Sequence, residues 1–126
     1  MHTGDFTEVG TESEVLDFRD WFVSQPHPHK VLIAGNHEIT FDLDFDRDEA
    51  CGRFHGGQHL DFNRIRRLVT DEPSIMYLEN SGCEIEGVRF WGSPNQPRFG
   101  GWAFNRYAGL EMRQVARMIP DDVDVL

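Results

Sequence analysis

The sequence predicts an α/β fold, and three observations support this prediction. Residues 31–33, Val-Leu-Ile, form a short apolar run that stops before Gly35, as in a strand buried on both faces. Residues 1–5 end in a similar way, at Gly4 and Asp5. The segment between these two stretches has helical periodicity, so a right-handed crossover would make the strands parallel, with their carboxyl ends at one edge of the sheet.

The connecting helix is expected over residues 11–25. Thr11 and Glu14 have the spacing of a capping box, in which each residue bonds to the backbone of the other. Apolar residues then recur at helical spacing at Val15, Phe18 and Phe22, with Leu16 and Trp21 beside them.

The second half of the chain predicts further helices and an antiparallel sheet. Helices are expected over residues 60–71 and 107–118, and in the second of these Leu110, Val115 and Met118 are expected to face inward. Strands are expected over residues 75–78, 83–86, 88–91 and 123–126. The hairpin that turns at Gly87 indicates a second sheet beginning there.

Three segments are expected to be irregular. Residues 39–57 carry alternating acidic residues without the offsets of a calcium loop, so a solvated acidic loop or surface helix is favoured, ending in a flexible connector at 52–57. His55 and His59 in this part of the chain are expected to be solvated. Residues 92–105 are expected to form a loop, in which Trp102 and Phe104 either shape a pocket or fill the core.

Length and charge limit the classes of function. The 126 residues allow one domain at most, and 22 acidic against 12 basic residues give a formal charge of −10. This charge argues against general binding to nucleic acid or to an anionic membrane. The sequence shows no signal peptide and no membrane-spanning run, and its two cysteines lack paired-motif spacing, so a reducing cytoplasmic location is expected.

Polar side chains follow both predicted parallel strands. Ala34 and Gly35 remove bulk at the first turn, which brings Asn36, His37 and Glu38 to the carboxyl end of a central strand, where open α/β sheets bind ligands. Asp5 would reach the same edge. Taken one at a time, these residues also have ordinary structural explanations: Asp5 could cap a helix, Asn36 could occupy a left-handed turn and His37 could be a loop histidine.

The order of these motifs resembles a known family. Gly4-Asp5-Phe6-Thr7 and Gly35-Asn36-His37-Glu38, separated by one helix, resemble two signature blocks of the calcineurin-like metallophosphoesterases. The likeness is greatest to their metallophosphoesterase-domain-containing branch. It continues through Trp91-Gly92-Ser93-Pro94, Gly101-Trp102-Ala103-Phe104-Asn105 and residues 119–126, and so runs almost from end to end.

The resemblance implies a fold and an activity. It implies that residues 1–126 are the central part of a four-layer α/β/β/α metallophosphoesterase sandwich, incomplete at both ends. It also implies a metal-dependent hydrolase, a phosphodiesterase acting on a small nucleotide-like phosphoester, with two divalent ions of manganese, iron or zinc. In that likeness Asp5 bridges the metals, Asn36 binds one of them, His37 is the catalytic residue facing the phosphoryl group, and Glu38 orients His37.

The family site also contains blocks that this chain lacks. An Asp-x-His block would precede Met1, and further histidines would come later, but no histidine follows His59. Asp5 and Asn36 alone cannot complete two cation sites of four to six ligands each. The sequence therefore leaves two hypotheses open: a phosphoester hydrolase, or a catalytically inactive fragment that acts as a binding module.

Overall fold

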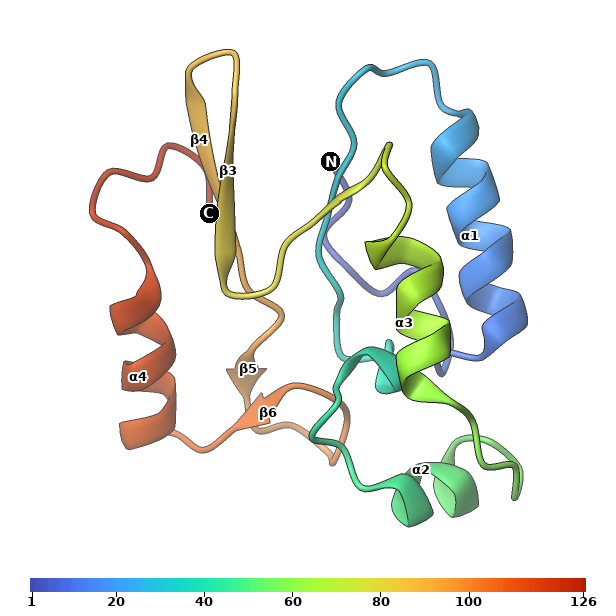
Figure 1. Cartoon of the computed structure of the whole chain (residues 1–126). Helices are drawn as coiled ribbons and strands as arrows, with labels where there is room; N and C mark the ends of the chain where they lie inside the picture. The colour runs from blue at the N-terminus through green and yellow to red at the C-terminus, as the bar shows by residue number, and fades with distance from the viewer.

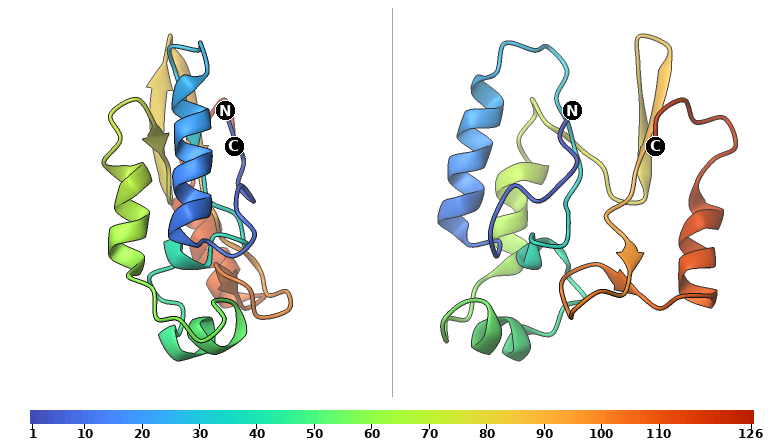
Figure 2. Two further views of the ribbon diagram at one scale, coloured as in Figure 1. Left: turned by 90° about the vertical axis from the view of Figure 1, so that its right-hand side faces the viewer. Right: turned by 180° about the vertical axis from the view of Figure 1, so that it is seen from behind.

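The structure is a computed structural model that describes residues 1–126, and it confirms the α/β class. Figure 1 shows α1, α2 and α3 on one side of the molecule, and the β3–β4 hairpin, α4 and the carboxyl terminus on the other. The view from behind in Figure 2 shows the same two halves. In chain order the elements are α1 (Glu12–Ser24), β1 (Val31–Leu32), η1 (Ile39–Phe41), α2 (Arg47–Arg53), α3 (Phe62–Thr70), β2 (Met76–Tyr77), β3 (Ser81–Ile85), β4 (Val88–Gly92), β5 (Gln96–Pro97), β6 (Asn105–Arg106) and α4 (Leu110–Met118).

The parallel crossover is confirmed, although its strands are short. β1 pairs in parallel with β2 on one side and forms a single parallel bridge with His2 on the other. The His2 amide donates to the Val31 carbonyl at 2.9 Å, and the Ile33 amide donates to the His2 carbonyl at 3.2 Å. The predicted first strand is thus one bridge, because Gly4, at φ +92°, turns the chain directly after it.

The core lies between the short parallel sheet and the helices α1 and α3. The capping box is present: the Thr11 amide donates to Glu14 Oε2 at 2.7 Å, and Thr11 Oγ1 accepts from the Glu14 amide at 3.5 Å. The fully or nearly fully buried side chains of these elements are Val15, Phe22, Leu32, Phe62, Ile65 and Val69. Apolar periodicity therefore predicted the buried face of α1.

The antiparallel hairpin is also confirmed. β3 and β4 pair from Ser81 opposite Gly92 to Ile85 opposite Val88. The two turn residues, Glu86 and Gly87, both have positive φ, at 52° and 81°, as a type I′ hairpin turn requires. The strand expected over residues 123–126 is reduced to one parallel bridge between Val125 and Phe90.

The prediction for α4 was wrong in part. The helix forms, but none of its residues is buried, and Leu110 and Met118 are 65% and 48% exposed. Val115 is half-buried. The helix has an apolar stripe, but no other helix or strand covers that stripe along the whole length of α4.

Three expectations for the irregular segments were also wrong in part. Residues 52–57 are not a plain connector, because α2 extends through Arg53, and His55 is only 7% exposed, with Nε2 at 3.0 Å from the Val9 carbonyl. The acidic segment is not fully solvated, because Ile39, Thr40 and Phe41 are 0% exposed. Asp42 is buried as well, and its carboxylate accepts from the Phe104 amide at 2.7 Å. Residues 92–105 contain β5, and Asn105 begins β6.

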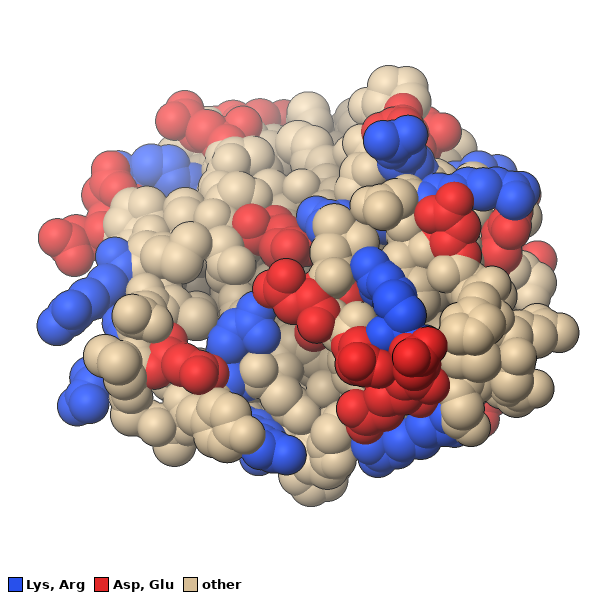
Figure 3. All heavy atoms as spheres, turned by 60° about the horizontal axis from the view of Figure 1, so that its bottom comes forward, with Lys and Arg blue, Asp and Glu red and all other residues tan.

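Charged side chains of both signs are interspersed on the face shown in Figure 3. The longest helix, α1, has 13 residues, and no helix combines the length and the apolar character that crossing a membrane would require.

Candidate functional site

The turn after His2 and the turn after β1 lie against each other, backbone to backbone. A Cβ atom on Gly4 would lie 2.4 Å from the Gly35 amide nitrogen, and one on Gly35 would lie 2.2 Å from Oδ1 of Asp5. Both distances are below any van der Waals contact, so both positions require glycine. The two glycines of the sequence motifs are therefore explained by the close approach of the two turns.

The side chain of Glu38 joins these two turns by hydrogen bonds to both. Its side chain is 0% exposed, and its carboxylate accepts four hydrogen bonds. Oε2 accepts from the amides of Asp5 at 2.9 Å and Gly35 at 2.6 Å, and Oε1 accepts from the amide and the hydroxyl of Thr7 at 2.8 and 2.9 Å. None of its hydrogen bonds goes to the imidazole of His37, so in this structure Glu38 holds the backbone of both turns.

Asp5 and Asn36, the predicted metal ligands, sit on these joined turns. Asp5 is exposed with φ at 55°, and its Oδ1 accepts from the His37 amide at 3.3 Å. The carboxylate therefore lies over the Gly35–His37 backbone, next to Asn36. The Asn36 carbonyl accepts from the Ala103 amide at 3.2 Å, while its side chain forms no hydrogen bond with the protein.

His37 is held by two contacts that the sequence did not predict. Its Nδ1 lies 2.8 Å from the Glu8 carbonyl, and because a carbonyl only accepts, Nδ1 carries a hydrogen. Nε2 then remains available to a ligand. The ring packs against Trp102, with centroids 4.3 Å apart and planes at 31°. A backbone carbonyl leaves no mark in a sequence, which explains why the role of Glu8 was missed.

Trp102 and Phe104, the two aromatic residues discussed for the segment 92–105, have different roles. Phe104 is 2% exposed and belongs to the buried core. Trp102 is half-buried and lies between His37 and Phe54, whose ring centroid is 5.0 Å from the indole. Phe104 therefore fills the core, and Trp102 helps to shape the site.

The side chains present do not form a two-metal centre. The structure contains no group of three or more His, Cys, Asp or Glu side chains that could hold a metal ion. One carboxylate and one amide oxygen suit a hard divalent cation, but they are too few for one complete coordination sphere. The pair of cations that the resemblance implies therefore does not fit the residues of this chain alone.

A groove of about 660 Å³ opens beside Asp5 and His37. One wall of the groove is formed by α1, which contributes Glu14, Asp17, Phe18 and Trp21. Burial alone would raise the pKa of Glu14, but hydrogen bonds from Thr11 and from the Glu8 backbone outweigh it and lower the pKa below the ordinary value.

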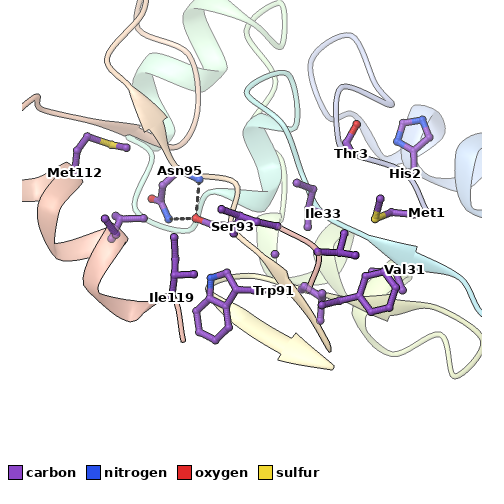
Figure 4. A pocket seen from close by; sticks show the side chains of 17 residues that line it. Met1, His2, Thr3, Val31, Ile33, Trp91, Ser93, Asn95, Met112 and Ile119 are labelled. Atoms are coloured by element: carbon purple, nitrogen blue, oxygen red, sulfur yellow. Dashed lines mark hydrogen bonds between the residues drawn. The ribbon is translucent and has the colours of Figure 1, made fainter. Parts of the chain in front are cut away.

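A separate apolar cavity of about 430 Å³ lies between the two halves of the molecule (Figure 4). His2, Ile33 and Trp91 line it, and none of the predicted site residues does. The rings of His2 and Phe18 meet edge to face at 5.0 Å, so His2 contributes to packing against α1.

The amino-acid sequence is similar to those of several known proteins. No family model matches the chain. Metallophosphoesterase domain-containing protein 1 of Homo sapiens, and the protein of the same name in Mus musculus, are 38% identical to it over 132 residues. UPF0046 protein K07C11.7 of Caenorhabditis elegans is 33% identical over 126 residues.

These matches cover 100% of this chain but only 40% of the two mammalian proteins and 41% of the nematode protein. The chain thus spans about two fifths of the length of these relatives. Because these matches cover the whole chain, the compared region includes both turns of the site and the hairpin. Along its full length, the chain is related in sequence to the metallophosphoesterase domain-containing proteins.

Proposed function

We propose that these residues form one part of the active site of a metal-dependent phosphoester hydrolase. The observation that carries the proposal is the pair of turns in which Glu38 fixes Asp5 beside the segment that bears Asn36 and His37. The names of the mammalian relatives support it. The substrate would be a small phosphodiester of nucleotide-like size, and the cations would be divalent, with manganese as the first candidate.

The residues of the chain have separate roles in this proposal. Asp5 and Asn36 offer oxygen ligands at one edge of the sheet. His37 is oriented by the Glu8 carbonyl and by Trp102. When the ring also carries a proton on Nε2, as an imidazolium, that nitrogen can donate to a phosphoryl or leaving-group oxygen. The ligands still needed would come from a longer polypeptide, in which these residues would be the middle of a four-layer sandwich.

One observation favours a second candidate, a catalytically inactive binding module. No group of three metal-ligating side chains forms within this chain. A protein consisting of these residues alone would then bind cations weakly and hydrolyse nothing.

The two candidates differ in metal content and in activity. We expect the full-length gene product to bind manganese and to hydrolyse bis(p-nitrophenyl) phosphate, and Asp5→Ala or Asn36→Ala to abolish both. Asp20→Ala, an exposed acidic residue on α1, is the control and should retain both. Full activity in Asp5→Ala would reject the site, and no bound metal at saturating manganese, measured by mass spectrometry, would establish the inactive module.

A further inference from the structure

The groove beside His37 has one wall made by a single face of α1. Glu14, Asp17, Phe18 and Trp21 are spaced by three or four residues, so their side chains lie on the same face of the helix. The opposite wall is the turn at Phe6, Thr7 and Glu8, and the groove ends at Asp5 and His37. Any part of a substrate that extends from His37 along α1 would enter this groove.

Aromatic rings line the groove without being fully buried. Trp21 is 54% exposed, although its place in the helix predicted a position beside the apolar face. Its ring lies 5.8 Å from that of Phe18, which stacks on Phe6 at 4.2 Å and an interplanar angle of 21°. Phe6 and Phe18 are anchored in the core, so the Trp21 indole lies next to a rigid aromatic surface.

Apart from His37, the ionisable side chains that line the groove are all acidic. No lysine or arginine lines it. The carboxylate of Glu14 accepts hydrogen bonds from the Glu8 amide and from Thr11. The carboxylates of Asp17 and Glu8 are exposed and form neither hydrogen bonds nor ion pairs. With Asp5 at the end of the groove, such a surface repels a second phosphate group and attracts a cation.

We infer that the groove binds an alkylammonium group, and that the substrate is a phosphodiester of a cationic amino alcohol of the choline type. Aromatic faces attract a quaternary ammonium through their π electrons, and free carboxylates add charge complementarity. The inference rests on the proposed function, because it places the phosphoryl group at His37. It narrows the substrate to esters whose alcohol carries a positive charge.

A binding experiment tests the groove without any metal or turnover. Choline and its uncharged carbon analogue, 3,3-dimethylbutanol, would be titrated into the protein while the indole N–H resonance of Trp21 is followed by NMR, assigned by its loss in Trp21→Ala. We expect choline to shift this resonance in the wild-type protein. We expect Asp17→Asn to bind choline with about two- to fivefold lower affinity. Asp20→Asn removes an equal charge from the same helix outside the groove, where Asp20 pairs with Arg19, and should bind choline normally.

Equal shifts with choline and 3,3-dimethylbutanol would overturn the inference. So would an equal loss of choline affinity in Asp17→Asn and Asp20→Asn, since that would reflect net charge and no local site.

An activity experiment separates this inference from the proposed function. The full-length protein with manganese would be given p-nitrophenyl phosphocholine and p-nitrophenyl 3,3-dimethylbutyl phosphate, which differ only in the charged atom. We expect a higher kcat/KM for the choline ester, and we expect Asp17→Asn to reduce the ratio of the two kcat/KM values. Asp20→Asn, outside the groove, should leave both values unchanged. Equal kcat/KM values on both esters would reject the ammonium site and leave the hydrolase intact. Choline binding without hydrolysis of either ester would reject the hydrolase and leave the ammonium site intact.

Discussion

Glu38 is the residue on which the local geometry of the site depends most. Its buried carboxylate satisfies the amides of Asp5, Thr7 and Gly35 together with the Thr7 hydroxyl. The sequence identified Glu38 as part of the site and expected it to orient His37. Its partners are mostly backbone amides, which no residue pattern reveals, so its observed role required the structure.

Glu38→Gln is expected to destabilise the protein by at least about 2 kcal/mol. The substitution replaces one buried acceptor oxygen by an NH₂ group that faces two donors, and each hydrogen bond lost at this buried side chain is worth about 1–3 kcal/mol. Urea unfolding followed by circular dichroism measures the change. Glu84→Gln, the same substitution at an exposed position of β3, should change stability by less than about 0.5 kcal/mol. Equal stability of the two variants would show that the bonds to Glu38 contribute little.

Among the elements, α1 links the core to the site. Its inward face buries Val15 and Phe22, and its outer face supplies the groove. Glu14 belongs to both functions of the helix, because it closes the capping box and also accepts from the Glu8 amide at 2.9 Å. The start of α1 is thereby tied to the residue whose carbonyl orients His37.

This arrangement makes the contribution of Glu14 depend on pH. Its pKa is lowered in the folded protein, so its stabilisation is fully present above its ordinary value of 4.5 and is lost as the pH falls through the folded value. We expect Glu14→Gln to be less stable than the wild type at pH 7 and the difference to shrink on acidification below 4.5. Thermal unfolding of both proteins across this range provides the measurement, and a constant difference at all pH values would contradict the assignment.

Helices α1, α3 and α4, and the hairpin with its turn at Gly87, were predictable because they depend on local periodicity and turn chemistry. The exposure of α4 was not, because an apolar stripe shows which face would be buried and not whether another element covers it. His55 illustrates the same limit: a histidine in a glycine-rich segment reads as solvated, yet packing against Phe62 and a bond to Val9 bury it. At the site, the motifs predicted the turns of Asp5 and Asn36, while the contacts of His37 depend on distant segments.

At the scale of the whole molecule, the carboxyl-terminal segment closes against β4. The Arg89 guanidinium pairs with Asp124 at 3.2 Å and also with Asp122, and the Trp91 amide donates to the Val125 carbonyl at 2.9 Å. The hydrogen bonds from Arg89 lower the pKa of Asp124. A small set of surface contacts therefore holds this segment beside the apolar cavity.

We expect Asp124→Asn to loosen this segment without unfolding the rest of the molecule. Hydrogen exchange at the Trp91 amide, which depends on the bridge to Val125, should become faster, while the Val15 amide inside α1 should be unchanged. Because the pKa of Asp124 is lowered, its tether is present above the ordinary value of 3.8 and is lost as the pH falls below it, so acid should loosen the wild-type segment in the same way. Unchanged exchange at Trp91 would show that the backbone bridge alone suffices.

The hydrogen bonds of Glu38 also bear on the order of folding. Its bonds to Asp5 and Thr7 join residues 33 and 31 positions apart, and the segment between them contains α1. Closing such a loop costs chain entropy before any contact offsets it, so these bonds belong to the late events of folding. We therefore expect the two joined turns to form after α1 and the β3–β4 hairpin, whose contacts are local in the sequence.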